Sequence, residues 1–283
     1  RSALDWYSGN TIHHNWKTST AGETLGSKIR EGKHVLLLDG LEVFQNPFNH
    51  PQPGRIKDPA LRQMLRTLSS TSVDNNACCI ITTRQPIPEL IGEQLAYHWD
   101  LPQLNGLAAR AILIDYKLTG GTYIYDEIAK HFQNHPLSLH LLGSHLSRRY
   151  RGDARKWKEI SNPMEGSTVA NHVIKILDSY NIALAADQDQ HQLMRVVSLF
   201  DRPVKRFELR ALCASNIPEV TDALGTLTGA SIANAIGHLQ DAHLLNDSPG
   251  YLELDTHPLI REYFRHQLHT SHTSSWQAAN LLL

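Results

Sequence analysis

The chain has 283 residues, of which 41% are hydrophobic and 19% charged, and its formal net charge is −1. This length is enough for two domains, or three small ones, each with its own core. The near-neutral charge excludes a strong overall attraction to nucleic acid or anionic lipid. No window approaches 18 uninterrupted apolar residues, which argues against a membrane span.

Cys78, Cys79 and Cys213 are the three cysteines, and their odd number and spacing do not suggest a disulfide framework. This use of cysteine favours a reducing cytoplasm. The sequence begins without Met and without the basic-then-apolar pattern of a signal peptide. We therefore interpret it as a piece of a longer cytoplasmic chain.

The first seventy residues combine helix and strand patterns. A short helix is predicted at 21–31, and the apolar run Val35–Leu38 that follows is typical of a parallel strand buried on both faces. Residues 45–58 hold three prolines and a glycine, which predicts a surface loop. Asp58 and Pro59 then begin a helix, as N-cap and first helical residue.

A second buried strand is predicted at 77–85 and a third at 97–104. The alternation of strands and helices predicts a doubly wound α/β sheet, whose ligands bind at the carboxyl ends of the strands. Asp39 and Arg84 fall at two such ends. We therefore expect these two side chains to share a site.

From about residue 106 the pattern becomes helical. Helices are predicted at 106–118, 123–132, 135–150 and 169–184, with a linking segment at 151–167 where Gly, Asn-Pro and Gly-Ser interrupt the pattern. The last third predicts helices at 191–200, 207–213, 217–227 and 230–245, a strand at 251–255 and a helix at 257–268. Several short helices followed by a small β element are the outline of a winged helix.

Asp39 could bind Mg²⁺, largely through water because Mg²⁺ keeps much of its hydration shell. It could equally be a turn aspartate, since Gly40 follows it. Glu42 could orient or activate a water for attack on a γ-phosphate. The alternative for Glu42 is a solvated loop side chain.

Three further positions could contact a nucleotide. Arg84 could meet a γ-phosphate with charge-assisted hydrogen bonds, or form a surface salt bridge. His135 and Pro136 begin a helix and could lie against an adenine, although proline is common there without a ligand. His257 lies near another helix start, where anions are favoured, and could donate to a phosphate or simply cap the helix.

Glu127, His131 and His135 are spaced four apart, so one helix face could carry all three. A metal site of this kind is conceivable, but Pro136 follows directly and no further ligand motif is evident. We do not expect a metal there.

The order of these elements resembles the bacterial STAND NTPases, which are relatives of the NB-ARC switch ATPases. The resemblance runs from about residue 4 to 269. It rests on the following segments in sequence: HVLLLDGLE, GRIKDPALRQMLRTL, CIITTR, DLPQLNGLAARAIL, HPLSLHLLGSHL, VVSLFDRP and LDTHPLIREYF.

The resemblance implies a role for each candidate residue. Asp39 corresponds to the Walker B aspartate that holds Mg²⁺, and Arg84 to sensor 1. The segment beginning His135-Pro136 corresponds to the GLPL-type motif at the adenine. His257 corresponds to the histidine of the MHD-type motif, which touches the β-phosphate of ADP.

The sequence departs from the family pattern in three places. Pro258 replaces the aspartate of the MHD-type motif, and Gly40 stands where an acidic residue usually follows the Walker B aspartate. Glu42 is then the candidate base, from its position alone. The Walker A loop is absent, and we expect it upstream of Arg1, before the strand that ALDWYSG resembles.

The expected architecture is α/β followed by all-α. It comprises a truncated P-loop NTPase parallel sheet (1–105), a helical domain (106–186), a winged-helix domain (187–272) and the start of a linker (273–283). The function that the resemblance implies is an ATP/ADP switch with Mg²⁺, closed with ADP and self-associating with ATP. An upstream effector and a downstream repeat sensor are the expected partners. Slow ATP hydrolysis is expected if Walker A precedes this segment.

Two other functions compete with the switch. The chain could be a degenerate scaffold that does not hydrolyse ATP. It could also be an ATPase-linked winged-helix transcriptional regulator, but the segment 231–245 contains no Lys or Arg. A helix that enters the major groove needs such cations, which argues against direct DNA binding.

Overall fold

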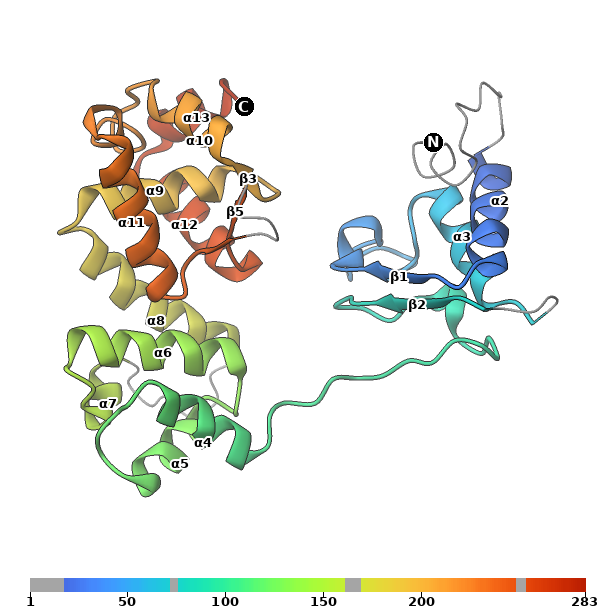
Figure 1. Ribbon diagram of the computed structural model, residues 1–283, viewed down its shortest axis with the longest axis horizontal. Coiled ribbons are helices and arrows are strands. Elements are labelled where there is room, and N and C mark those ends of the chain that lie inside the picture. The colour runs from blue at the N-terminus through green and yellow to red at the C-terminus, as the bar shows by residue number, and fades with distance from the viewer. Residues whose placement is uncertain (1–17, 72–75, 161–168, 248–252) are drawn as a thin grey trace. The chain divides into compact units, whose positions relative to one another are not determined.

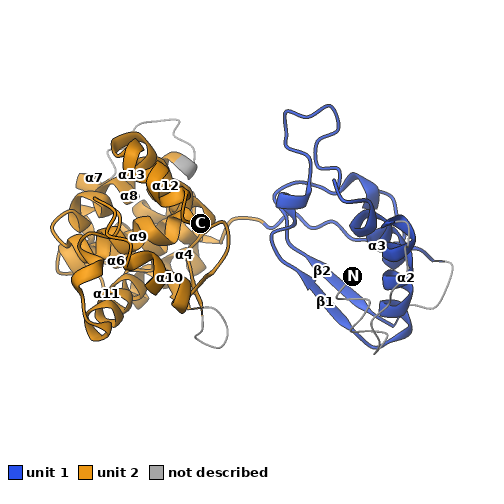
Figure 2. Cartoon of the chain, turned by 90° about the horizontal axis from the view of Figure 1, so that it is seen from above, with its two compact units in different colours: residues 1–101 blue, residues 102–283 orange. Residues whose placement is uncertain are grey.

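The computed structural model describes residues 18–71, 76–160, 169–247 and 253–283 (Figure 1). The strand expected within ALDWYSG lies outside these residues. The chain forms two compact units, residues 1–101 and 102–283 (Figure 2). No described helix is long and apolar enough to cross a membrane.

The first unit is built on two parallel strands, β1 (Val35–Leu38) and β2 (Cys78–Ile81), in which Val35 lies opposite Cys78. Two helices, α2 (Thr18–Glu31) and α3 (Pro59–Ser69), pack on one side of these strands (Figure 1). Short 3₁₀ turns follow the strands at Leu41–Phe44 and Pro88–Leu90. The core between the layers contains Ile29, Leu41, Ile56, Met64, Leu65, Leu68 and Ile87.

Two glycines allow α2 to approach α3 closely. A Cβ added to Gly22 would lie 2.0 Å from the carbonyl oxygen of Ala60, and one added to Gly26 would lie 2.8 Å from Cβ of Thr67. Gly22 and Gly26 are four residues apart and so share one helix face. Larger side chains on that face would push the two helices apart.

The prediction that the strands are buried on both faces is wrong. Val35 is 73% exposed and Leu37 is 64% exposed, whereas Leu36 and Leu38 pack against the core. The side chains of a strand alternate between the two faces of a sheet. Because α2 and α3 cover one face, and no other described element covers the opposite one, only alternate residues are buried.

The third strand predicted at 97–104 does not form. These residues have no regular structure, and Tyr97, Trp99 and Leu101 are exposed. The alternating pattern suits a strand, but a strand exists only where a neighbour satisfies its backbone groups. No described segment pairs with this one.

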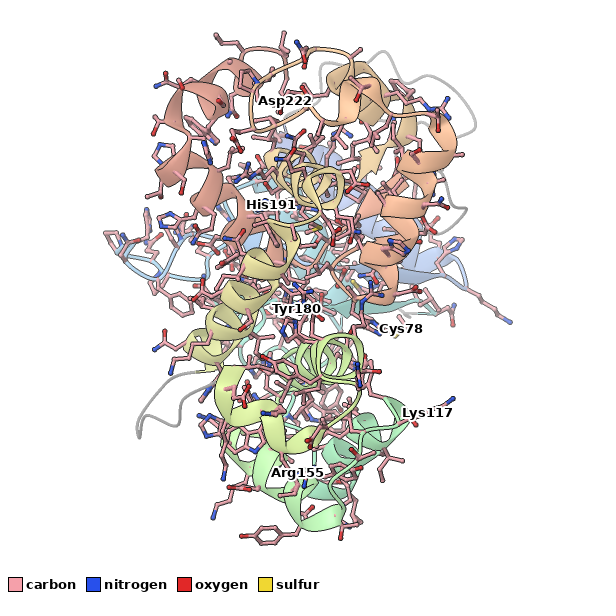
Figure 3. All side chains as sticks on the ribbon, turned by 90° about the vertical axis from the view of Figure 1, so that its left-hand side faces the viewer. Cys78, Lys117, Arg155, Tyr180, His191 and Asp222 are labelled. Atoms are coloured by element: carbon pink, nitrogen blue, oxygen red, sulfur yellow. The ribbon has the colours of Figure 1, made fainter. Side chains whose placement is uncertain are left out.

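The second unit is mostly helical, with α8 lying between two groups of helices (Figures 1 and 3). The first group contains α4 (Gly106–Asp115), α5 (Thr122–His131), α6 (Pro136–Arg149) and α7 (Trp157–Ile160), with α8 at Val169–Leu184. The second group contains α9 (Gln188–Leu199), α10 (Arg206–Cys213), α11 (Gly229–Asp241), α12 (Pro258–Ser271) and α13 (Thr273–Asn280). A small antiparallel sheet accompanies the second group, with β3 (Val204–Lys205), β5 (Glu253–Asp255) and β4 (Asn246–Asp247) in that order.

Three segments differ from expectation. The predicted linking segment at 151–167 contains α7, where Trp157 is buried. The helix predicted at 217–227 is reduced to a 3₁₀ turn at Leu224–Thr226. Residues 273–280, expected to begin a linker, form α13, and Ala279 there is buried.

The expected boundary between residues 186 and 187 falls inside the second unit, between α8 and α9. Hydrogen bonds join residues on either side of it. Ser144 Oγ donates to the carbonyl of Asp241 at 3.1 Å. The Tyr263 hydroxyl donates to Asp178 Oδ1 at 2.7 Å.

Candidate functional site

The carboxyl ends of β1 and β2 meet at one edge of the sheet, and Thr82 joins them. Its hydroxyl donates to Oδ1 of Asp39 and accepts the backbone N–H of Gly40 at 2.9 Å. Its backbone N–H donates to the carbonyl of Leu38 at 3.0 Å, and its carbonyl accepts the N–H of Leu41 at 2.9 Å. The carboxylate of Asp39 is therefore oriented by the neighbouring strand.

Gly40 makes the turn after Asp39. Its φ is +67°, in the left-handed region that glycine enters without strain, and the 3₁₀ turn beginning at Leu41 follows directly. A Cβ at Gly40 would meet nothing within 4 Å. The space beside this turn is open.

Glu42 and Arg84 form an ion pair at the same edge. Oε1 of Glu42 lies 3.1 Å from Nε of Arg84, whose side chain is 54% exposed. Oε2 of Glu42 is buried and has no hydrogen-bond partner among the described residues. Because the Arg84 side chain remains largely in solvent, water can replace Glu42 as its partner.

Gln45 fixes the backbone beside Arg84. Its amide Nε2 donates to the carbonyls of Gly54 at 2.7 Å and Pro86 at 3.1 Å, and its Oε1 accepts the hydroxyl of Thr83. Gln45 is buried, so these bonds tie the proline-rich loop to the exit of β2. Sequence reasoning missed this role, because a single glutamine in a loop carries no motif. The role of Thr82 was also missed, because the sequence shows this residue only as part of the segment CIITTR.

The residues at this edge fit a hydrated Mg²⁺. Asp39 offers an exposed carboxylate beside open space, and Mg²⁺ is usually held by one or two carboxylates together with waters and substrate phosphates. No group of three or more His, Cys, Asp or Glu in the described parts of the chain could hold a metal. The donor set at this edge therefore suits a Mg²⁺ held by one carboxylate together with waters.

His135 and Pro136 belong to the second unit and begin α6. His135 is the N-cap, and its Nδ1 accepts the backbone N–H of Ser138 at 3.3 Å. Burial lowers the pKa of His135 below its usual value, which favours the neutral ring. A neutral ring whose Nδ1 accepts carries its proton on Nε2, so His135 presents an N–H donor on its other side.

His257 has the same arrangement at the start of α12, followed by Pro258. Its Nδ1 accepts the backbone N–H of Leu259 at 3.2 Å, and the residue is exposed. The neutral tautomer again places a donor on Nε2. His-Pro thus begins a helix at these two places in the second unit, and the histidine accepts the N–H three residues on in α6 and two residues on in α12.

The three residues considered as metal ligands, Glu127, His131 and His135, each contact a different partner. Glu127 pairs with Lys158 at 2.7 Å. The ring of His131 lies 4.7 Å from that of Trp157, and His135 caps α6.

Of the six candidate residues, the structure brings together Asp39, Glu42 and Arg84 at one edge of the first unit. The other three, His135, Pro136 and His257, belong to the second unit and lie at helix starts.

Comparison with known proteins finds likeness only among solved structures. No family model matches the chain, and no curated protein is similar to it. A signal transduction ATPase with numerous domains (STAND), with a tetratricopeptide repeat sensor, from Pyrococcus horikoshii superposes with a TM-score of 0.59 at 14% identity. The match covers 96% of this chain and 33% of that protein, so the chain spans about one third of its length.

A second structure, a Walker-type ATPase of Pyrococcus abyssi, matches with a TM-score of 0.31 at 12% identity, over 93% of this chain and 75% of that one. This score is too low to bear on the fold. The first match shows a fold and not an activity, since its identity is low. The chain has a fold similar to part of a STAND ATPase.

Proposed function

We propose that the chain is the nucleotide-binding switch core of a STAND-type ATPase related to NB-ARC proteins, closed with ADP and self-associating with ATP. The observation that carries the proposal is the meeting of Asp39, Glu42 and Arg84 at the carboxyl edge of two parallel strands. Open α/β sheets bind ligands at this edge.

Asp39 is the residue that would hold Mg²⁺, which when bound supplies positive charge to the nucleotide phosphates. Thr82 orients Asp39 through its hydroxyl. Glu42 is the proposed base for an attacking water, and Oε1, the oxygen that now pairs with Arg84, would accept the proton.

Arg84 is the proposed sensor of the γ-phosphate. In the described state its charge is taken up by Glu42. A phosphate carries more charge than a carboxylate and can accept two parallel bonds from a guanidinium. ATP would therefore draw Arg84 away from Glu42 and leave the carboxylate of Glu42 able to accept a proton. This exchange couples recognition of ATP to activation of the base.

The second unit supplies the remaining proposed contacts. His135 and Pro136 would lie against the adenine, and His257 would donate from Nε2 to the β-phosphate of ADP. We infer that residues 187–272 act as a winged helix, because α9 to α11 accompany a three-stranded antiparallel sheet. Loss of the His257 contact on exchange for ATP would release a rigid-body movement that permits self-association. An attached effector and a repeat sensor are the proposed partners.

A non-hydrolysing scaffold is the second candidate. It is favoured by the ion pair that occupies Glu42 and by Gly40 in place of an acidic residue after Asp39. The transcriptional regulator is disfavoured, because α11 has no Lys or Arg for phosphates.

The test measures nucleotide binding and turnover in the full-length protein. Arg84→Gln is expected to weaken ATP by about tenfold, the loss of one charge-assisted contact, with ADP affinity unchanged. Glu42→Gln is expected to keep ATP affinity and abolish hydrolysis. If the wild type binds ATP without turnover, the scaffold is correct. If folded wild-type protein releases no nucleotide on denaturation and binds none on addition, both functions are wrong.

A further inference from the structure

A cavity of about 360 Å³ lies within the second unit, where α6, α8, the start of α9 and the end of α11 meet. It is lined by His145, Arg148, Arg149, Tyr180, Asp187 and Gln190, among others. Figure 3 shows Tyr180 at the junction of the two helix groups. The cavity lies at the opposite end of α6 from His135, roughly 15 Å along the helix at about 1.5 Å per residue.

His145, which lines this cavity, has a buried polar atom without a partner among the described residues. His145 is 3% exposed, and its Nδ1 makes no hydrogen bond among the described residues. The ring packs edge-on against Tyr180, with centroids 4.6 Å apart. Buried polar atoms in native proteins are nearly always paired, so Nδ1 is a position where a ligand atom is expected.

The charges around the cavity favour an anion. Arg149 makes no ion pair or hydrogen bond with any described residue, and it lies near enough to His145 to help lower the pKa of that ring. Arg148 has only a long contact, 3.9 Å from Oδ2 of the exposed Asp241. Two guanidinium groups are thus largely uncommitted at one wall.

The opposite wall is the start of α9, a helix of 12 residues. Its N-cap, Asp187, makes no side-chain hydrogen bond to the helix. The first backbone N–H groups of a helix lack intrahelical partners and carry partial positive charge. Three carboxylates oppose this positive charge. Asp187 is the N-cap, Asp189 accepts the backbone N–H of Gln190 at 2.9 Å, and Asp241 lies 3.9 Å from Arg148. Arg149 is therefore the cation of this wall that no described carboxylate pairs with.

We propose that this cavity binds a small molecule that carries a phosphate or carboxylate group, received by Arg148 and Arg149, and a second polar group that bonds Nδ1 of His145. The site is separate from the proposed nucleotide site and does not depend on it. The volume lies at the lower end of the range of ligand pockets, roughly 300–1000 Å³, which suits a metabolite. A bound ligand would bridge α6 to α9 and so tie the two helix groups together.

Calorimetric titration of the full-length protein tests the proposal, with inorganic phosphate and succinate as separate probes. Binding of phosphate alone, succinate alone or both identifies the anionic group and supports the site. Arg149→Gln is expected to weaken binding at least tenfold, and Arg151→Gln, an exposed arginine outside the cavity wall, is the matched control. Asp187→Asn is expected to strengthen binding, because it removes a carboxylate from the wall.

Each titration is repeated with saturating ADP to separate this site from the nucleotide site. Binding that Arg149→Gln weakens and ADP leaves intact is the expected result. The proposal is overturned if neither probe binds, if Arg149→Gln binds like wild type, if Asp187→Asn binds more weakly, or if ADP abolishes the signal. Thermal unfolding of each variant confirms that it is folded.

Discussion

Thr82, directly after β2, links the two residues that follow β1 to the neighbouring strand. Its hydroxyl serves Asp39 as a donor and Gly40 as an acceptor at once. Valine or alanine at this position would leave both groups to solvent. The orientation of the candidate Mg²⁺ residue therefore depends on a side chain 43 positions away, which is why neither residue alone identifies the site.

His145 makes the stability of the second unit depend on pH. Burial, assisted by Arg149, lowers its pKa from 6.5 to about 4. The unfolded chain therefore binds a proton at this histidine near pH 6.5, whereas in the folded chain the ring stays neutral until the pH falls to about 4. Stability is complete above pH 6.5 and falls as the pH falls towards 4. From this residue alone the loss between pH 7 and 5 is about 2 kcal/mol.

His145→Gln should remove that share of the pH dependence, as measured by urea unfolding at pH 7 and pH 5. Other histidines with lowered pKa values, His191 among them, act in the same direction, so the variant retains a smaller slope. His266→Gln changes an exposed ring and should retain the wild-type difference between the two pH values. Equal slopes in wild type and His145→Gln would contradict the assignment.

The His-Pro starts of α6 and α12 combine two functions at the scale of a helix. Proline supplies a suitable φ at the first position, and Nδ1 of the histidine pairs an otherwise unsatisfied amide. The cap uses only Nδ1, so Nε2 takes no part in it. Under the proposed function, Nε2 of His257 donates to the β-phosphate of ADP.

Replacement of His257 separates these two functions. His257→Ala removes both cap and donor and should destabilise the protein by about 1 kcal/mol. His257→Asn restores the cap and should keep wild-type thermal stability. If His257 donates to the β-phosphate of ADP, both variants bind ADP more weakly and self-associate more readily. Wild-type ADP affinity in His257→Asn would mean that His257 caps the helix and does not contact ADP.

Elements whose signals are local could be predicted from sequence. Asp58 caps α3 as expected, its side chain accepting from the N–H of Leu61 at 2.7 Å, and α8 occupies 169–184 as its periodicity indicates. The strand at 97–104 failed because no described segment pairs with it. The helix at 217–227 failed although Ile217, Val220 and Leu224 are buried, because the backbone at Glu219 has a positive φ that a right-handed helix does not allow. The local residue pattern gives a segment its tendency to form a helix or strand, and tertiary contacts decide whether that element forms.

The candidate site likewise has one part that the sequence predicts and one part that it does not. Asp39 and Arg84 could be placed at strand ends from apolar runs alone. The pairing of Arg84 with Glu42, and the clamp formed by Gln45, could not. The ion pair and the bonds of Gln45 to Thr83 and Pro86 join positions about 40 residues apart, so no local spacing encodes them.

At the scale of the whole molecule, the two units differ in how much apolar surface they bury. The second unit has one continuous core that runs through all its helices from α4 to α13. The first has a small core on one side of two strands, and the other face of the sheet leaves Val35, Leu37 and Ile80 exposed. Hydrophobic stabilisation grows with the area removed from water, so the second unit should be the more stable.

Heating the 283-residue chain should therefore give two transitions, with the first unit unfolding first. Residues 91–104, which carry the exposed side chains of Tyr97 and Trp99 and have no helix or strand, should be the preferred site of limited proteolysis. The fragment from about residue 102 onward should keep its helical circular dichroism and the upper transition, because its core is complete within itself. A single transition that the isolated fragment does not reproduce would mean that the second unit depends on the first, and that the division at residue 101 is not a division in stability.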